Sequence, residues 1–202
     1  MKDTLIGTLL GDGYLEPHGR GVRLQILHSE RFKAYVEWKH QELAELQPSP
    51  LHYQANRGYP YWRFVTRCHP VLAELRAIFY RNGKKAIPEN IADLLTSPKS
   101  LAVWFMDDGA CDQRQGSLKI ETQCFAYEEL ERLCDALLRN FGVEAHIHRS
   151  PKRKAHWLYL PVAQARTFAQ MIEPFVVPVM RYKLPFPVTT EGVMPEMGCP
   201  AR

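Results

Sequence analysis

The sequence has few of the features that direct a chain to a membrane, to export or to a disulfide framework. It has no run of about 18 apolar residues, which argues against a transmembrane helix. The first apolar segment begins at Leu5, with no charged leader or cleavage-site pattern ahead of it. The five cysteines are odd in number and lack Cys-x-x-Cys spacing, which argues against a disulfide framework and against a zinc site. We therefore expect a globular protein in a reducing compartment.

The net charge is also low, so charge alone does not mark a nucleic-acid-binding protein. The 26 Lys and Arg residues and the 22 Asp and Glu residues give a formal charge of +4, which many ordinary proteins carry. Basic residues and histidines are nevertheless concentrated between Glu144 and Trp157, in what should be a single hairpin. This cluster favours a nucleic-acid contact, and a solvated loop is the alternative.

Two apolar segments organise the rest of the chain. Leu5–Gly13 reads LIGTLLGDG, and Leu101–Gly109 reads LAVWFMDDG. A helix that is apolar on every side must be buried, yet each segment ends in a carboxylate just before a glycine, Asp12 in the first and Asp108 in the second. A single Asp-Gly pair is usually a turn that leaves a helix. Two such pairs, each behind a matching apolar helix, indicate a shared function.

Aligning Asp12 with Asp108, an offset of 96 residues, shows that the two halves of the chain repeat one order of elements. Each half reads helix, hairpin, helix, hairpin, helix. The predicted fold class is therefore α+β, a pseudo-twofold tandem of two αββαββα repeats, each with a four-stranded antiparallel sheet. The predicted divisions are a first repeat at 1–87, a connector at 88–98, a second repeat at 99–185 and a flexible tail at 186–202.

Turn residues set the expected ends of individual elements. The helix that begins at His69-Pro70 is expected to end near Asn82-Gly83. The amphipathic helix Tyr127–Phe141 is expected to be closed by the glycine that follows it. In the second hairpin of each half, Trp157 falls 95 residues after Trp62, which supports the repeat.

The repeat predicts a metal site. Two buried helices related by a pseudo-twofold axis can pack side by side and bring Asp12 and Asp108 together. Two close carboxylates raise each other's pKa unless a cation lies between them. Mg²⁺ suits this position, because it takes few protein oxygens and keeps waters and substrate phosphates as its other ligands. That composition fits phosphodiester hydrolysis. A metal-free structural module, in which both aspartates only close turns, is the alternative.

The outward residues of the predicted strands suit duplex DNA. Strands can lie in the major groove, where Arg suits guanine and Gln or Asn suits adenine. Two such sheets beside one metal centre would hold a long, asymmetric site, and a hydrated sheet face is the alternative at each position. The candidate DNA-binding residues, including the basic hairpin, are Arg20, Arg23, Gln25, His52, Gln54, Asn56, Tyr61, Arg63, Arg114, Ser117, Lys119, Gln123, His146, His148, Arg149, Lys152, Arg153, Lys154 and His156.

The two apolar segments resemble the signature helices of the LAGLIDADG homing endonucleases, in their monomeric two-motif type. The resemblance implies a site-specific endonuclease that cuts both strands of duplex DNA across the minor groove with Mg²⁺, leaves short 3′ overhangs and promotes mobility of its host intron. Mn²⁺ is expected to substitute. The resemblance spans roughly residues 3–185, and the similar runs are Leu5–Gly13, Ser100–Gly109, Lys84-Lys85 with Ile87-Pro88, and Arg181–Pro185.

The resemblance implies roles for individual residues at the two helix ends. It makes Asp12 and Asp108 the metal-binding catalytic acids. It also implies that the backbone carbonyls of Gly11 and Asp107 complete the metal shell. The side chain of Asp107 stands where the family usually has a small residue, so we expect that it is not a ligand.

Two lysines also match the family, and three helix positions depart from it. Lys85 and Lys183 match basic residues around the active site that polarise water or neutralise phosphate charge, and an ordinary surface lysine is the alternative for each. Val103 stands where a glycine usually allows close helix approach. Leu10 and Met106 stand where an acid is usual. None of these differences removes a catalytic carboxylate.

Other functions on the same scaffold are an RNA maturase, with the chain's own intron RNA as partner, and a DNA-binding regulator that does not cleave. The two intact aspartates favour the nuclease, with double-stranded DNA as its partner. We expect a monomer without membrane association, in the cytoplasm or nucleoid of a prokaryote or in an organelle matrix.

Overall fold

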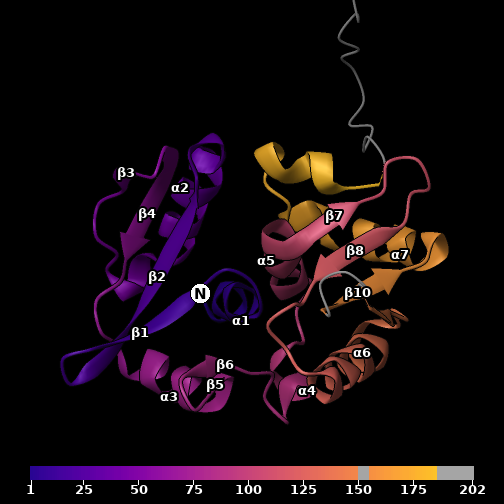
Figure 1. Ribbon diagram of the computed structural model, residues 1–202, viewed down its shortest axis with the longest axis horizontal. Coiled ribbons are helices and arrows are strands. Elements are labelled where there is room, and N and C mark those ends of the chain that lie inside the picture. Colours follow the sequence, from indigo (N-terminus) through magenta and orange to yellow (C-terminus); the bar gives the residue numbers. More distant parts are fainter. Residues whose placement is uncertain (150–154, 186–202) are drawn as a thin grey trace, which may run out of the picture.

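Two four-stranded sheets flank a central pair of helices in this computed structural model, which describes residues 1–149 and 155–185 (Figure 1). The central helices are α1 (Lys2–Leu10) and α5 (Pro98–Asp108), and they pack against each other. All strand pairs within the two sheets are antiparallel, so the predicted fold class is confirmed. Within the described ranges, no helix is long and apolar enough to cross a membrane.

The contact between α1 and α5 depends on one glycine. The residues from Thr4 to Leu10 are buried, and so are those from Ser100 to Met106. A Cβ atom on Gly7 would lie 2.6 Å from the Cβ of Val103 and would also meet the carbonyl oxygen of Ser100. Val103 therefore fits into the interface because the facing helix has a glycine at this position.

The first sheet has the strand order β1-β2-β4-β3. Along β2, the buried residues Val22, Leu24 and Ile26 alternate with the less buried Arg23 and Gln25, as predicted. Helices α2 and α3 pack against β2. The first-half elements after α1 are β1 (Tyr14–His18), β2 (Gly21–Ser29), the 3-10 helix η1 (Glu30–Phe32), α2 (Lys33–Glu42), η2 (Ala44–Leu46), β3 (His52–Asn56), β4 (Tyr59–Val65) and α3 (Pro70–Phe79).

The second sheet repeats this topology in the order β7-β8-β10-β9. Helix α6 has the predicted bounds and is closed by Gly142 with φ of 64°. A short helix, α4 (Ile91–Leu94), precedes α5. The second-half elements after α5 are β7 (Gly109–Cys111), β8 (Leu118–Glu121), α6 (Tyr127–Phe141), β9 (His146–Arg149), β10 (His156–Leu160), α7 (Val162–Ile172), η3 (Glu173–Phe175) and η4 (Pro178–Lys183).

The predicted end of the third helix is wrong. Helix α3 ends at Phe79, and Asn82 and Gly83 form the turn of a small hairpin between β5 (Tyr80–Arg81) and β6 (Lys84–Lys85). Both turn residues have positive φ, of 51° and 77°. Asn-Gly is a strong signal for a two-residue hairpin turn, and this signal prevails here over the helix-ending role of glycine. The hairpin carries Lys85 back toward α1.

The two halves keep an offset of 96 residues only as far as their first strands. Tyr14 pairs with Gln25, and Ala110, which lies 96 residues after Tyr14, pairs with Lys119. Gln25 and Lys119 are 94 residues apart, because the second-half hairpin is two residues shorter. Equivalent positions differ by 94 residues between β2 and β8 and between β4 and β10, and the difference returns to 96 in the edge strands β3 and β9.

The spacing of 95 residues places the two tryptophans on opposite faces. Arg63 pairs with Leu27, and Trp157 pairs with Glu121, so Trp157 takes the place of Arg63 on the outer face. Trp62 lies one residue away from Arg63 and on the other face. Because successive side chains of a strand alternate between faces, a one-residue difference exchanges them. The spacing of 95 residues is therefore not a structural equivalence.

Candidate active site

The two predicted carboxylates lie at the C-terminal ends of the paired helices. Asp108 is the last residue of α5, and Asp12 follows Gly11, where α1 ends. Burial, and then the negative charges of Asp12 and Asp107, raise the pKa of Asp108 to about 8, against the opposing charges of two lysines. The fold thus brings Asp12 and Asp108 into one electrostatic site.

Asp12 remains open to solvent. Its side chain is 50% exposed and lines an open pocket together with His28, Asp107 and Lys183. The partial burial of this half-exposed side chain, and then the charge of Asp107, raise the pKa of Asp12, while three nearby lysines act in the opposite direction. A reacting group in the pocket can therefore reach this carboxylate.

The two predicted lysines bind the ends of the helices in the same way. Lys85 Nζ donates to the carbonyl oxygen of Gly11 at 2.5 Å. Lys183 Nζ donates to the carbonyl oxygens of Met106 at 2.6 Å and Asp107 at 3.0 Å. Burial lowers the pKa of both lysines. Neither is an ordinary surface lysine, because each contacts the C-terminal end of the interface helix in its own half.

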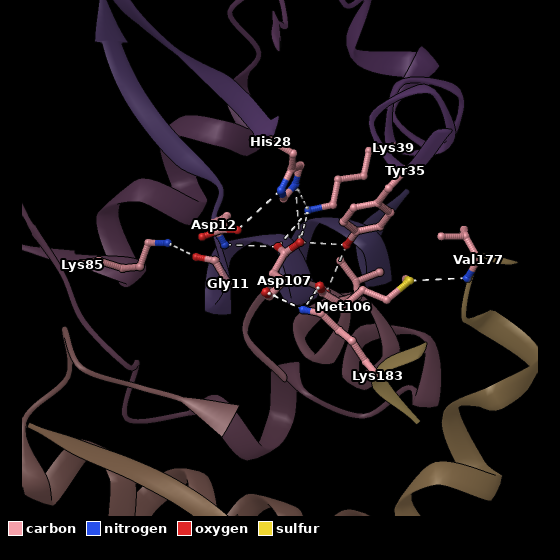
Figure 2. Close-up of polar contacts among 11 residues, drawn as sticks. Gly11, Asp12, His28, Tyr35, Lys39, Lys85, Met106, Asp107, Val177 and Lys183 are labelled. Carbon is pink, nitrogen blue, oxygen red and sulfur yellow. Dashed lines mark hydrogen bonds and ion pairs between the residues drawn. The ribbon is translucent and has the colours of Figure 1, made fainter. Parts of the chain in front are cut away.

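A buried ion pair lies beside Asp12 (Figure 2). The ammonium group of Lys39, from α2, lies 2.8 Å from both carboxylate oxygens of Asp107, and the hydroxyl of Tyr35 donates to Oδ1 at 2.8 Å. The side chains of Lys39 and Asp107 are fully buried. Burial acts to raise the pKa of Asp107, but Lys39 and the hydrogen bonds outweigh it and hold this pKa below its usual value. The oxygens of Asp107 are thus already engaged, unlike those of Asp12.

His28, on β2, connects this ion pair to Asp12. Its Nε2 lies 3.5 Å from Lys39 Nζ, and its Nδ1 lies 3.6 Å from Asp12 Oδ2. Burial, and then the charge of Lys39, lower the pKa of His28 to about 4, so the ring is neutral at pH 7. The same Nε2 lies 3.6 Å from Asp107 Oδ1, slightly farther than from the Lys39 ammonium group, which only donates. We therefore assign Nε2 as the acceptor. The hydrogen is then on Nδ1, which faces Asp12.

Sequence reasoning missed His28 and Lys39 as site residues, although both left a signal. His28 continues the inward series of Val22, Leu24 and Ile26 along β2. Lys39 lies three residues after Val36 on the buried stripe of α2 and is itself fully buried. A titratable residue on a predicted buried face must have a hydrogen-bond or charge partner. The presence of His28 and Lys39 on such faces therefore indicated a buried polar site.

The first sheet presents the predicted DNA-binding residues as expected. The pairing register places them on the face opposite the buried side chains, with Arg20 in the turn between β1 and β2. Two of these side chains have partners on the sheet, because Arg23 Nε lies 2.6 Å from Glu16 Oε2 and the Tyr61 hydroxyl donates to Gln54 at 2.9 Å. The residues on this outer face are Arg23, Gln25, His52, Gln54, Asn56, Tyr61 and Arg63.

The second sheet differs from expectation at three positions. Ser117 is only 4% exposed. Arg149 and His156 pair with each other on the face that carries buried Leu158, and the His156 ring lies 5.5 Å from that of Tyr127 in α6. Their predicted outward orientation is wrong. Arg149 and His156 directly neighbour the outward-facing His148 and Trp157, so they take the opposite face, and Ser117 lies just before β8, outside its alternation.

Other predicted residues of the second half do face outward. Lys119, His146 and His148 lie on the outer face of the sheet, and Arg114 and Gln123 are exposed beside it. Two unpredicted aromatic residues join them. Trp157 lies under Lys119, whose Nζ is 4.5 Å from the ring centroid, and Tyr159 stacks on His148. The predicted positions Lys152, Arg153 and Lys154 lie outside the described residues.

Paired αββαββα repeats with a carboxylate at the end of each interface helix define a protein of LAGLIDADG architecture. A model of the LAGLIDADG DNA endonuclease family matches residues 2–168. The chain belongs to this family.

Individual relatives support the assignment over nearly the whole chain. A probable intron-encoded endonuclease 1 of Wickerhamomyces canadensis is 30% identical over 93% of this chain and 85% of that protein. The solved homing endonuclease I-WcaI, bound to its DNA recognition sequence, has 32% identity and a TM-score of 0.80 over 93% of this chain and 86% of that one. A protein RecA of Mycolicibacterium flavescens is 33% identical over 89% of this chain. The chain spans only 45% of the length of that RecA relative.

Proposed function

We propose that this chain is a site-specific endonuclease that hydrolyses both strands of a long, asymmetric DNA duplex with a divalent metal ion and leaves short 3′ overhangs. One observation carries the proposal: Asp12 and Asp108 come together at the ends of two interface helices that lie between two four-stranded sheets. Each sheet belongs to one half of the chain, so a duplex that crosses both sheets passes the carboxylates. The proposed role is to promote mobility of a host intron.

The chemistry of the carboxylates fits a divalent cation. Burial and like charge raise the pKa of both Asp12 and Asp108, so their joint ionisation is unfavourable without added positive charge. We propose that these two carboxylates hold Mg²⁺, with Mn²⁺ as a substitute. Bound there, the metal would stabilise charge on the attacking and leaving oxygens of the phosphodiester. Asp107 does not fit as a side-chain ligand, because Lys39, Tyr35 and the Asp12 amide already occupy its oxygens.

The backbone carbonyls and the lysines complete the proposed centre. The carbonyl oxygens of Gly11 and Asp107 accept hydrogen bonds from Lys85 and Lys183, and each oxygen keeps a second lone pair for the metal. We propose that the two ammonium groups orient water and neutralise phosphate charge at the cut. Burial lowers the pKa of both lysines, and this supports the role, because a buried ammonium group gives up its proton more readily than an exposed one.

The outer faces of the sheets are the proposed DNA-binding surface. The first face offers arginine and amide groups suited to base edges. The second offers His146, His148 and Lys119 beside two aromatic rings. We expect the protein to bind as a monomer, because one chain supplies both sheets and both carboxylates. It should act where its target DNA resides, in a prokaryotic cytoplasm or nucleoid or in an organelle matrix.

A cleavage assay tests the proposal. The substrate is a duplex made by joining the two sequences that flank the host element, and the control is the same DNA with the element in place. We expect Mg²⁺-dependent scission of both strands of the joined duplex only, with the cut positions mapped on each strand separately. Tight binding of the joined duplex without scission in Mg²⁺ or Mn²⁺ would show a regulator that does not cleave. Faster splicing of the host intron RNA, with the DNA left intact, would show a maturase.

A further inference from the structure

We propose that Asp107, Lys39 and His28 form a brace that positions Asp12 and that has no counterpart for Asp108 among the described residues. The two halves of the active site are then unequal, and scission of one DNA strand depends on the brace more than scission of the other. The part of this inference that concerns strand scission rests on the proposed endonuclease function.

The first link of the brace holds the backbone of Asp12. The Asp12 amide donates to Asp107 Oδ2 at 3.1 Å, across the boundary between the two halves of the chain. Lys39 and Tyr35 hold the same carboxylate from α2. Because the Asp107 side chain is fully buried and bonded at both oxygens, it has little freedom to move. The amide of Asp12 therefore has a fixed acceptor.

The second link faces the Asp12 carboxylate itself. His28 Nε2 lies 3.5 Å from the Lys39 ammonium, and Nδ1 lies 3.6 Å from Asp12 Oδ2 on the opposite edge of the ring (Figure 2). The contact with Lys39 sets both the orientation of the ring and the position of its hydrogen. Lys39 thus reaches Asp12 by two routes, through Asp107 to the backbone and through His28 to the side chain.

The second half has different residues at each equivalent position. Gly11 stands where the first half would need its own aspartate, 96 residues before Asp107. In the register of the sheets, the place of His28 is taken by Thr122, whose hydroxyl donates to the carbonyl oxygen of His156 at 3.1 Å. Helix α6 begins 94 residues after α2, and this offset puts Leu133, a buried residue of α6, at the place of Lys39.

Sterics restrict the brace to one side. A Cβ atom on Gly11 would lie 2.5 Å from both the Cβ and Oδ2 of Asp107. The carboxylate therefore occupies the volume that a side chain at residue 11 would need, and two such braces cannot coexist at the ends of these helices. The asymmetry follows from the close approach of the two helix ends.

Hydrogen exchange in the free protein tests the first link. The double variant Lys39→Met with Asp107→Ala removes both charges together, so neither is left buried without its partner. We expect the Asp12 amide, followed by NMR, to exchange at least about tenfold faster than in the wild type. The neighbouring Gly13 amide, which donates to the Thr8 carbonyl oxygen at 2.8 Å, should keep its protection. Unchanged exchange at Asp12, or equal acceleration at both amides, overturns the first link.

Strand-resolved cleavage tests the functional consequence. We expect the double variant and His28→Leu to change the ratio of the two strand rates by about tenfold and to accumulate nicks in the same strand. Leu133→Met is the matched control, because it places methionine at the equivalent position of the other half, and it should leave the ratio unchanged. Equal slowing of both strands, or nicks in opposite strands for the two variants, overturns the proposal.

The two measurements separate the brace from the nuclease proposal. If the wild-type protein leaves the joined duplex intact while the Asp12 amide responds as expected, the proposed function is wrong and Asp107 still positions Asp12. If the wild type cuts both strands and neither exchange nor strand ratio changes in the variants, the function holds and the brace is wrong.

Discussion

Val103 packs against the bare backbone of Gly7, where a Cβ atom would lie 2.6 Å from the Cβ of Val103. Gly7→Ala should therefore destabilise the protein by about 3 kcal/mol, because the clash outweighs the roughly 1 kcal/mol that alanine adds inside a helix. Urea unfolding measures the change. Val103→Gly in the same chain should restore part of the loss, since the Ser100 carbonyl remains in the way. A Gly7→Ala protein as stable as the wild type would contradict the packing.

Asp12→Asn and Asp108→Asn should each abolish cleavage and leave DNA binding within about threefold of the wild type. Each change removes a proposed metal ligand and keeps the shape of the side chain. Gel-shift titrations and strand-resolved cleavage of the joined duplex measure the two effects. Asp93→Asn, at an exposed position in α4, is the control and should cleave normally. Full activity in either active-site variant would remove that residue from the mechanism.

Asp108 should make the metal-free protein less stable as the pH rises. Its pKa is about 8 in the folded protein, above the unfolded value, so the folded state binds the proton more tightly and stability falls between about pH 4 and pH 8. Asp108→Asn removes this loss, so the variant should exceed the wild type by about 5 kcal/mol at pH 8 and match it near pH 4. Thermal unfolding across this pH range measures the difference. A difference that does not grow with pH would contradict the raised pKa.

Lys85→Met and Lys183→Met should reduce cleavage by about 10²-fold with little loss of stability. Burial already disfavours the charged form of both lysines, so an apolar side chain of similar length relieves that cost. Single-turnover cleavage and thermal unfolding measure the two effects. Lys84→Met, at the exposed neighbour of Lys85, provides the control. If the Lys84 and Lys85 variants had equal activity, Lys85 would have no role in cleavage beyond that of an exposed surface lysine.

Trp157→Ala should weaken DNA binding by about tenfold, because its ring belongs to the outer face with Lys119. Trp62→Ala should chiefly reduce stability, because Trp62 packs against the core from the inner face. Comparing DNA titrations with urea unfolding for the two variants separates these effects. If Trp62→Ala weakened DNA binding and Trp157→Ala chiefly reduced stability, the assignment of the two tryptophans to opposite faces would be wrong.

The parts of the fold that rest on periodicity were predictable from the sequence. The buried helices that lead to Asp12 and Asp108, the alternation along β2 and the bounds of α6 all follow from local patterns. The end of α3 was not, because Asn82-Gly83 suits both a helix end and a hairpin turn, and the pairing of β5 with β6 decides between them. The residues near Asn82 and Gly83 do not by themselves show which of the two structures forms.

The active site was predicted only where a motif marks it. Asp12, Asp108 and the two lysines stand in sequence motifs of the family. Lys39 and His28 belong to the site only because they contact Asp107, which comes from the other half of the chain. Contacts between residues so far apart in the chain produce no characteristic spacing in the sequence. The orientation of Ser117, Arg149 and His156 was missed for other reasons. Neighbouring residues of a strand face opposite sides, so Arg149 and His156 take the face opposite to their neighbours His148 and Trp157, and only the strand register shows which neighbours face outward. Ser117 lies just before β8, where strand alternation does not determine exposure.

The steric exclusion between Gly11 and Asp107 has a consequence for chimeras built from two members of this family. A first half that carries alanine or serine at residue 11 would collide with Asp107 when joined to this second half. A second half with a small residue at 107 would leave Lys39 without its counter-ion when joined to this first half. Residues 11, 39 and 107 must therefore be exchanged together. Residues 11 and 39 belong to the first half and residue 107 to the second, so a chimera joined between the halves would separate them.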